Sequence, residues 1–438
     1  MDSIKPDGIS LHEAFPGGSV RLVARKRLAL DIDFRKIVIM RDSTINVREA
    51  RLVYDEKNIL LMTPGPVPLH PRVYQAMSRV VFHHRTPEYK KTFGECVSMM
   101  KEVMQTENDV FILTGSGTAA MEAAIANCVS PRDKVLILIS GKFSERWAEL
   151  TETFGGKSIP LEVEWGKAIK PQIVSEALDK EPDIKFVAIC HNETSTAVLN
   201  PLPEIAKITK EHDKILIVDG ITSVGGDYVY PDKWGVDILI TGSQKCLGCS
   251  PGLGMIMVGP KAWEVINERE KIPSYYLNLP AYKKSFEKSS EPPYTSAISL
   301  IYGLHEALKI ILEEGYENRV KRHRLMAKAL RNGIEALDLQ LLAEKGYESN
   351  TITAARYPDG VDDGAFRKAM QKHGILVAGG QSHLKGKIFR VAHMNIIAER
   401  EILLVLAMTG LVLRELGFKC ESGAGVSAAQ EIFLKNLK

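Results

Sequence analysis

Three short segments of the chain place side chains that can do chemistry directly after runs of apolar residues. The segment Thr114–Thr118 follows one run, Asp219 ends a second, and Lys245 comes shortly after a third. In an open parallel sheet, ligands bind beyond the carboxyl ends of the strands. If the apolar runs are such strands, these residues are the first to examine for a binding or catalytic site.

The segment Thr114–Thr118 has the composition of a phosphate-binding turn. A Gly-rich turn that opens a helix presents free backbone N–H groups and the positive end of the helix dipole, and Ser116 and Thr118 add hydroxyl donors. The segment also overlaps a dinucleotide-binding pattern that ends at Ala120. It lacks the Gly-Lys-Ser/Thr of a P-loop. A plain helix-capping turn remains an alternative on this observation alone.

A carboxylate and an amine complete a set that suits one cofactor. Asp219, at a strand end, could hydrogen-bond a cationic nitrogen of a ligand, and an N-cap or a solvated turn is the alternative. Lys245 follows a buried strand among Gly, Ser and Gln, where desolvation would lower its pKa and free the amine for Schiff-base chemistry. The cradle, the Asp and the Lys together match pyridoxal 5′-phosphate (PLP), which needs a phosphate site, a partner for its ring nitrogen and an amine.

Six stretches of the chain occur in the order known from one enzyme family. They are Thr63-Pro64-Gly65-Pro66, Thr114-Gly115-Ser116-Gly117-Thr118, His191-Asn192-Glu193-Thr194-Ser195-Thr196, Val218-Asp219, Gly242-Ser243-Gln244-Lys245 and Gly386-Lys387-Ile388-Phe389-Arg390-Val391. This order resembles the class V aminotransferases, which are fold-type I PLP enzymes, and most closely the alanine–glyoxylate and serine–pyruvate aminotransferases. The similarity runs over residues 59–415, more than four-fifths of the chain.

The resemblance implies a fold and a reaction. The fold would be α/β, with a large PLP-binding domain built on a mainly parallel seven-stranded sheet and a smaller C-terminal α/β domain. The reaction would move the amino group of a small L-amino acid, alanine or serine, to glyoxylate or pyruvate in ping-pong half-reactions. Lys245 would form the Schiff base and later move the substrate proton, and Asp219 would pair with the pyridinium. Both are therefore the expected catalytic residues.

The resemblance also implies which residues bind the cofactor and the substrate. Ser116, Gly117, Thr118 and Gln244 would hold the phosphate, Phe143 and Ile221 would pack on the two ring faces, and Thr194 would bond the ring hydroxyl oxygen. The substrate contacts would be Arg390 for the α-carboxylate, Gly65 in the pocket loop, and His84 near the entrance. Thr295 matches a phosphate contact given by the neighbouring subunit, so the resemblance implies a homodimer with its active site at the interface.

The sequence disfavours several other functions. Aspartate, or a phosphonate or sulfonate amine, is an alternative substrate within the same family. A cysteine desulfurase would carry histidines where Phe143 and Gln244 stand, and a cysteine within 274–294 or 379–386. A nicotinamide oxidoreductase would need an acidic residue about 20 residues beyond the Gly-rich turn, and it would leave Lys245 unexplained. A non-catalytic regulator with this fold would not need Lys245, Asp219 and Arg390 intact.

The elements that must position these residues follow from apolar periodicity. Between residues 58 and 281, six apolar runs flanked by Gly, Pro, Asp or Asn alternate with helix-like segments, which predicts a mainly parallel sheet covered by helices. The polar segment 282–294 is expected to be a loop. Beyond it, a long helix and three further short strands predict a second α/β domain. We therefore expect domains at 59–295 and 296–438.

Residues 1–58 lie outside the family pattern. Three β-branched stretches, Val20–Ile32, Lys36–Met40 and Ile45–Tyr54, suggest strands, so a β-rich extension of unknown role is expected. This segment holds 11 basic and 9 acidic residues, which supplies most of the chain's net charge of +3. A nucleic-acid arm at Arg25–Arg27 is one interpretation, and the solvated face of a small β appendage is the favoured one.

The composition excludes several protein classes. The 438 residues are 45% hydrophobic and 25% charged, which is ordinary for a globular protein and rules out a disordered, collagen-like or disulfide-framed chain. With 57 basic and 54 acidic residues, neither nucleic acid nor an anionic membrane is expected as a partner. No apolar run approaches the ~20 residues of a membrane span, and no signal peptide is visible, so a cytoplasmic location is expected. The lone Cys246-x-x-Cys249 pair does not predict a metal site.

Overall fold

The computed structural model describes residues 20–24, 28–32 and 59–436 and divides the chain into two units, 1–54 and 55–438. In the first unit, β1 (Val20–Ala24) pairs antiparallel with β2 (Leu28–Ile32). The expected strand Val20–Ile32 is therefore two strands of a hairpin. The other two stretches expected to be strands, 36–40 and 45–54, lie outside the described residues.

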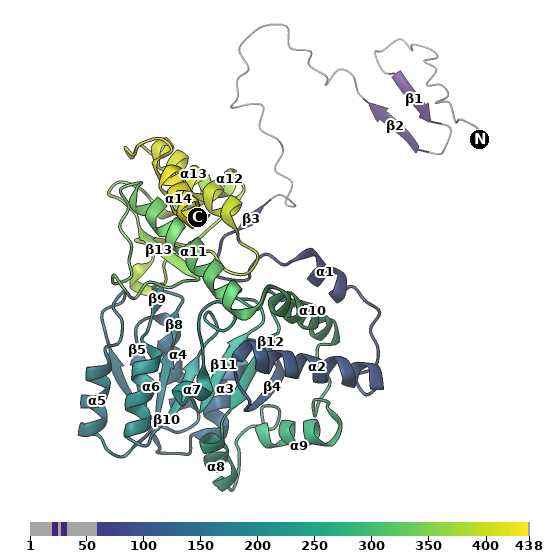
Figure 1. Cartoon of the computed structure of the whole chain (residues 1–438), viewed down its shortest axis with the longest axis vertical. Helices are drawn as coiled ribbons and strands as arrows, with labels where there is room; N and C mark the ends of the chain where they lie inside the picture. The colour runs from purple at the N-terminus through teal and green to yellow at the C-terminus, as the bar shows by residue number, and fades with distance from the viewer. Residues whose placement is uncertain (1–19, 25–27, 33–58, 437–438) are drawn as a thin grey trace. The chain divides into compact units, whose positions relative to one another are not determined.

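A seven-stranded sheet forms the centre of the second unit (Figure 1), which confirms the predicted α/β fold. Strand β12 runs antiparallel to both of its neighbours, and the other four pairings are parallel. In spatial order the strands are β4 (Asp109–Thr114), β12 (Leu253–Val258), β11 (Ile238–Gly242), β10 (Ile215–Asp219), β7 (Ile184–Cys190), β5 (Lys134–Ile139) and β6 (Lys157–Glu162). The six apolar runs are six of these strands. The seventh, β6, lies at the sheet edge with half-exposed side chains, so it shows no apolar run.

Helices cover both faces of this sheet because alternate side chains of each strand enter different cores. In β4, Val110 and Ile112 belong to one apolar core, while Phe111 and Leu113 belong to the other. The first core takes side chains from α2 (Pro87–Met104), α5 (Pro171–Lys180), α6 (Leu202–Glu211) and α10 (Ile298–Glu314). The second takes them from α3 (Gly117–Cys128), α4 (Lys142–Thr153), α8 (Pro260–Glu268) and α9 (Leu279–Ser289).

Helix α9 corrects the expectation of a loop at 282–294. The side chain of Asn278 caps the helix by accepting the N–H of Ala281 at 3.0 Å. Leu279 and Tyr282 are buried against the second core. The loop prediction was wrong because lysines and serines on the exposed side of this helix conceal an apolar side with few residues.

A smaller three-stranded sheet lies towards the C-terminus (Figure 1). Its strands are β13 (Ile352–Arg356), β16 (Ile388–Ala392) and β15 (Ala378–Gly379), and two of them, β13 and β16, are among the three expected. The helices beside this sheet are α11 (Tyr316–Glu335), α12 (Asp363–Lys372), α13 (Glu399–Glu415) and α14 (Ala424–Asn436). The third expected strand, at 375–377, is β14 (Ile375–Leu376), which lies outside this sheet. A two-residue parallel pairing joins it to β3 (Leu60–Leu61). The start of the family-like region therefore contacts the smaller domain.

The division of the second unit at residue 295 stays a prediction. Helix α10, which follows that position, packs against α1 (Pro71–Met77) and α2, and its buried side chains belong to the first core of the large sheet. Helix α10 therefore packs with the large sheet although it follows residue 295.

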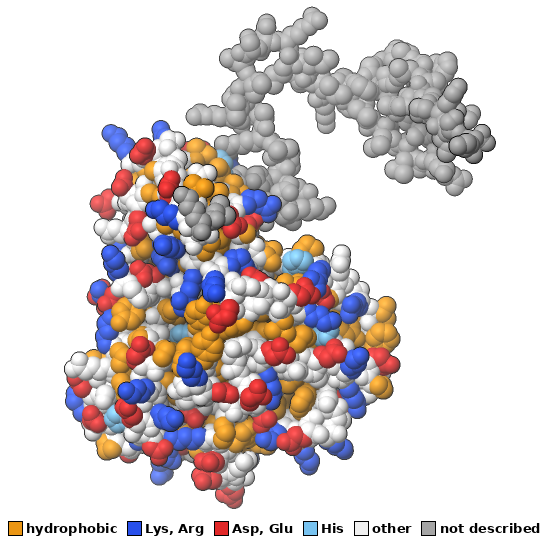
Figure 2. Space-filling view, in the orientation of Figure 1, with side chains coloured by type: hydrophobic (Ala, Val, Ile, Leu, Met, Phe, Trp, Pro, Cys, Tyr) orange, Lys and Arg blue, Asp and Glu red, His pale blue; other side chains and the backbone are white. Residues whose placement is uncertain are grey.

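The surface of this unit is mixed in charge. Figure 2 shows acidic and basic side chains interspersed over the visible face. Within residues 59–436 and the two hairpin strands, no helix is long and apolar enough to cross a membrane, and no group of three or more His, Cys, Asp or Glu side chains could hold a metal ion.

Candidate active site

The carboxyl ends of neighbouring strands bring the chemistry-bearing residues together. Asp219 is the last residue of β10 and lies opposite Ile240 of the adjacent parallel strand β11. Lys245 follows the end of β11 by three residues. The turn that opens α3 follows β4, two strands further along the sheet. The residues that the sequence singled out therefore lie together at the carboxyl ends of the strands of this sheet.

Lys245 is enclosed and held by the loop that carries Gly65. Its Nζ donates a hydrogen bond to the carbonyl oxygen of Pro64. Burial, together with the positive charge of Arg390, lowers the pKa of Lys245 to about 8. Near neutral pH, more of this amine is therefore unprotonated than in an ordinary lysine, which makes it a better nucleophile.

The close contact between Lys245 and residue 65 requires a glycine at that position. A Cβ at Gly65 would lie 2.5 Å from Cδ and 2.7 Å from Nζ of Lys245, and the backbone has φ +103°, a value that favours glycine. The loop after β3 can therefore lie against the amine only because residue 65 has no side chain.

The first turn of α3 is open to an anion. Ser116 is the N-cap residue, and its side chain makes no capping hydrogen bond. The backbone N–H groups of Gly117 and Thr118 have no acceptor among the described residues. Free N–H groups at a helix N-terminus are a ready site for phosphate.

Two further observations fit a phosphate at this turn. A Cβ at Gly117 would lie 2.5 Å from Cδ1 of Ile221, so a larger residue would close the cradle. The buried Oε1 of Gln244 has no hydrogen-bond partner. Since amide oxygen and nitrogen are assigned by their surroundings, the reverse orientation would present an NH₂ donor to a phosphate. These residues therefore fit the phosphate of PLP.

Asp219 is a buried carboxylate with two hydrogen-bond donors beside it. Its Oδ1 accepts the N–H of Ile221 at 2.7 Å, and the thiol of Cys190 lies 3.4 Å from Oδ2. Burial raises the pKa of Asp219 to about 6. The group is therefore mainly ionised at neutral pH, and a cationic ring nitrogen would stabilise that charge further.

Arg390 and Thr194 are joined although 196 positions separate them. Arg390, on β16, donates from Nη1 to the carbonyl oxygen of Thr194 and from Nε to that of Gly379, both at 3.0 Å. Burial lowers the pKa of Arg390 to about 10, so it stays cationic. The Nη2 group makes no hydrogen bond to the part of the chain that the structure describes, and it can therefore bind a carboxylate.

Glu193 is a site residue that the sequence reasoning missed. It ends β8 (Asn192–Glu193), and its buried carboxylate accepts the N–H groups of Phe143, Ser144 and Ser195 at 3.3, 2.9 and 3.0 Å. Glu193 thereby holds the first turn of α4, which carries Phe143, against the turn that carries Thr194. The available signal was an acidic residue among hydroxyl residues directly after a buried strand.

Two expected site residues make no bond to the reactive side chains. Thr295 is exposed, two residues before Ala297, whose N–H donates to Thr114 Oγ1 at 3.1 Å. His84 is half-buried, with its ring 4.5 Å from that of His83. Among the described residues, no hydrogen bond or ion pair joins His84 or Thr295 to Lys245 or Arg390. Their roles stay predictions.

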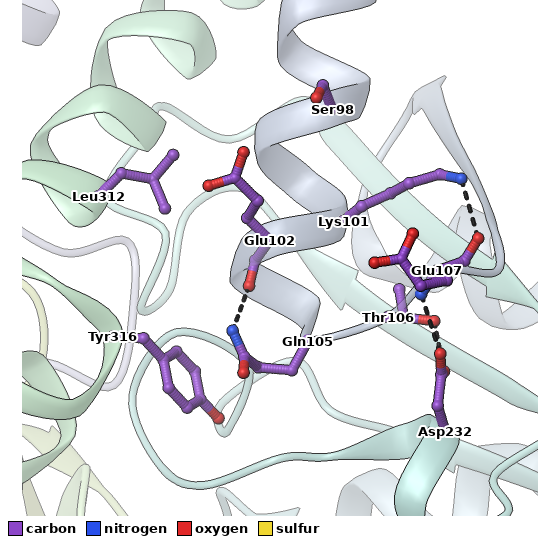
Figure 3. A pocket seen from close by; sticks show the side chains of 9 residues that line it. All are labelled: Ser98, Lys101, Glu102, Gln105, Thr106, Glu107, Asp232, Leu312 and Tyr316. Carbon is purple, nitrogen blue, oxygen red and sulfur yellow. Dashed lines mark hydrogen bonds between the residues drawn. The ribbon is translucent and has the colours of Figure 1, made fainter.

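A polar groove elsewhere on the molecule is not part of this site. Figure 3 shows its lining side chains, which come from the end of α2, α7 (Pro231–Trp234) and the α10–α11 region. Lys101 donates to the carbonyl oxygen of Glu107, and Asp232 accepts from Thr106 and from the N–H of Glu107 (Figure 3). These polar groups bond to one another, and none of the expected site residues lines the groove.

The chain is similar to known proteins of one family. Residues 69–397 match the family model described as Aminotransferase class-V. An uncharacterised aminotransferase of Methanocaldococcus jannaschii is 48% identical over 86% of this chain and 98% of its own length.

Two solved structures are also similar to this chain. The pyridoxamine–pyruvate aminotransferase of Mesorhizobium loti has a TM-score of 0.84 and 32% identity, covering 87% of this chain and 99% of its own. The alanine–glyoxylate aminotransferase of Nostoc sp. has a TM-score of 0.79 and 34% identity, covering 85% of this chain and 100% of its own.

Proposed function

The chain belongs to the class V aminotransferases and is a PLP-dependent aminotransferase of fold type I, and from this premise we propose that it moves the amino group of alanine or serine to glyoxylate or pyruvate. The observation that carries the proposal is the pair formed by the enclosed amine of Lys245, which bonds the Pro64 carbonyl, and by Arg390, which bonds the turn that carries Thr194 and lowers the pKa of Lys245 by its charge. This pair supports a substrate with an amino group next to a single carboxylate.

Each residue of the site has a role that its surroundings support. When bound, PLP supplies an electron sink for the charge left on the substrate Cα when that carbon loses its proton. Lys245 Nζ takes and returns this proton, since its lowered pKa suits a general base near neutral pH. Arg390 holds the α-carboxylate through its planar guanidinium. Asp219 supplies a fixed negative charge at the carboxyl end of β10.

The preference for a small uncharged side chain also rests on this site. Gly65 lies against Lys245, so the loop after β3 closes the pocket beside the amine. Arg390, which bonds the turn that carries Thr194, is the one cation of the described site that we assign to a substrate carboxylate. A donor with a second carboxylate, such as aspartate, would need a second cation to offset the cost of burying that charge. Alanine and serine need none.

A panel of single amino acids tests the proposed donor. Purified holoenzyme should convert to its pyridoxamine form with alanine or serine in the absence of an acceptor, and the visible absorbance band should disappear. Aspartate, 2-aminoethylphosphonate and pyridoxamine serve as comparison donors, and glyoxylate or pyruvate should then restore the band. Faster conversion by aspartate would contradict the proposed donor class, and sulfide release from cysteine would favour a desulfurase.

Arg390→Ala should raise the KM for the amino donor and leave the affinity for PLP nearly unchanged. Loss of a charge-assisted pair of hydrogen bonds predicts a roughly 10- to 100-fold rise in KM. Steady-state kinetics with alanine and serine measure the effect. Arg390→Lys is the comparison variant, because it keeps the charge without the two-pronged geometry, and it should recover only part of the loss. An unchanged KM in Arg390→Ala would remove Arg390 from the substrate site.

We also propose that the enzyme is a homodimer with Thr295 contacting the neighbouring cofactor. Thr295 is exposed in the single chain. An apolar run on the α1–α2 connection is exposed as well: Val80 is 76%, Val81 57% and Phe82 54% accessible. Burial of such side chains favours association. Light scattering should give twice the chain mass of 48.6 kDa, and a monomeric active enzyme would contradict the proposal.

A cytoplasmic location is proposed on the state of the cysteines. All six are free thiols, and five of them are buried. Disulfides are rare in reducing compartments. Cell fractionation followed by detection of the protein tests the location, and recovery from a secreted fraction would contradict it.

A further inference from the structure

The phosphate of PLP lacks an assigned counter-charge in this site. The residues expected to hold it, Ser116, Gly117, Thr118 and Gln244, bear no formal charge. The N-terminus of α3 contributes only about half a positive charge, and Lys245 is used at the other end of the cofactor. Because the charge of an anion taken from water is costly to bury, a nearby cation would stabilise the bound phosphate further.

Arg146 lies where such a cation would act. It is on α4, one turn after Phe143. Its Nη1 donates to Thr118 Oγ1 at 3.3 Å. The guanidinium carbon lies 5.3 Å from the centre of the Phe143 ring. Arg146 therefore contacts both a residue of the cradle and the aromatic side chain expected to stack on the cofactor ring.

The acidic residues on α4 leave Arg146 without an ion-pair partner. Lys142 lies 2.7 Å from Glu145 and 3.9 Å from Glu149. No ion pair among the described residues includes Arg146. Although burial raises the pKa of Asp219 overall, the charge of Arg146 acts in the opposite direction on that carboxylate. The positive charge of Arg146 therefore acts on Asp219 inside the site.

We propose that Arg146 is a cofactor-binding residue that supplies the counter-charge to the phosphate of PLP and is held in place by Thr118 and the Phe143 ring. The inference rests on PLP being the cofactor and does not depend on which amino acid is the donor. It assigns to α4 two functions in cofactor binding: Phe143 for the ring and Arg146 for the phosphate.

The test compares PLP with pyridoxal, which has the same ring and aldehyde but no phosphate. Apoenzyme is titrated with each compound, and binding is followed by absorbance, for the wild type, Arg146→Met and Arg146→Lys. Loss of a charged hydrogen bond predicts PLP binding weaker by roughly 10- to 100-fold in Arg146→Met. The affinity for pyridoxal should change by less than about threefold, and Arg146→Lys should restore most of the PLP affinity.

Controls separate this role from a structural one. Lys142→Met removes a cation from the same helix outside the cradle and should bind PLP like the wild type. Inorganic phosphate should raise the melting temperature of the wild-type apoenzyme and have less effect on Arg146→Met. If Arg146→Met is poorly folded, the comparison uses Arg146→Gln.

Two results would overturn the inference. Equal losses of PLP and pyridoxal affinity would mean that Arg146 acts through the ring of Phe143, and unchanged PLP affinity would mean that it has no binding role. Failure of the wild type to bind PLP would instead contradict the cofactor itself.

Discussion

Lys245→Ala should abolish transamination, lowering the rate by at least about 10⁴-fold. The variant loses both the amine that attaches the cofactor and the group that moves the substrate proton, and no second lysine bonds to the loop around Gly65 in the described part of the chain. Turnover with alanine and glyoxylate measures the loss of proton transfer. Loss of the visible absorbance band of the covalently attached cofactor measures the loss of attachment.

The control for Lys245→Ala must show that the fold survives. The circular dichroism spectrum and the urea midpoint should match those of the wild type closely, since the change removes a buried amine and leaves the apolar cores intact. Borohydride treatment of the wild type should fix the cofactor to the peptide that contains Lys245. Attachment to another lysine, or full activity in the variant, would remove Lys245 from the mechanism.

Asp219→Asn should lower kcat by about 10²- to 10⁴-fold, the range expected when one partner of a buried charge pair is neutralised. The asparagine can still accept the N–H of Ile221, so the local backbone should keep its place. What is lost is the negative charge that would keep the ring nitrogen of PLP protonated. Because the pKa of Asp219 is raised to about 6, the wild-type carboxylate provides that charge near neutral pH.

The matched control for Asp219→Asn is Asp237→Asn. Asp237 is a half-buried carboxylate whose pKa is also raised by burial, and it accepts the N–H of Leu216 at 2.8 Å. Leu216 lies near the start of β10, at the opposite end of the strand from Asp219. Asp237→Asn should therefore lower stability without a comparable loss of kcat. Equal kcat losses in the two variants would mean that Asp219 acts only through stability.

The fold could largely be predicted because the pattern of apolar residues along each short segment indicates its secondary structure. Runs of apolar residues such as Lys134–Ile139 and Ile215–Asp219 became strands buried on both faces, as continuous apolar stretches in an α/β protein predict. An edge strand such as β6 could not be predicted in this way, because its half-exposed side chains do not form an apolar run. Helix α9 was missed for a related reason, since its lysine-rich exposed face outweighs a narrow apolar one.

The site was predictable only in part. The placement of Asp219, Lys245 and the α3 turn at one edge follows from the direction of parallel strands, which the sequence pattern already indicates. Glu193 and Arg146 were not found, although both lie within or near quoted motifs. Their importance comes from partners 49 and 28 positions away, and a pattern of neighbouring residues holds no information on such partners.

By itself, the sequence determined the fold class, the family resemblance and the set of reactive side chains, because apolar periodicity and short motifs act over a few residues. Tertiary structure alone decided how these side chains meet. It placed Gly65 against Lys245, joined Arg390 to Thr194 and left Arg146 directed at Thr118. The physical reason is that these contacts depend on how sheets and helices pack against one another, and packing is set by the whole chain.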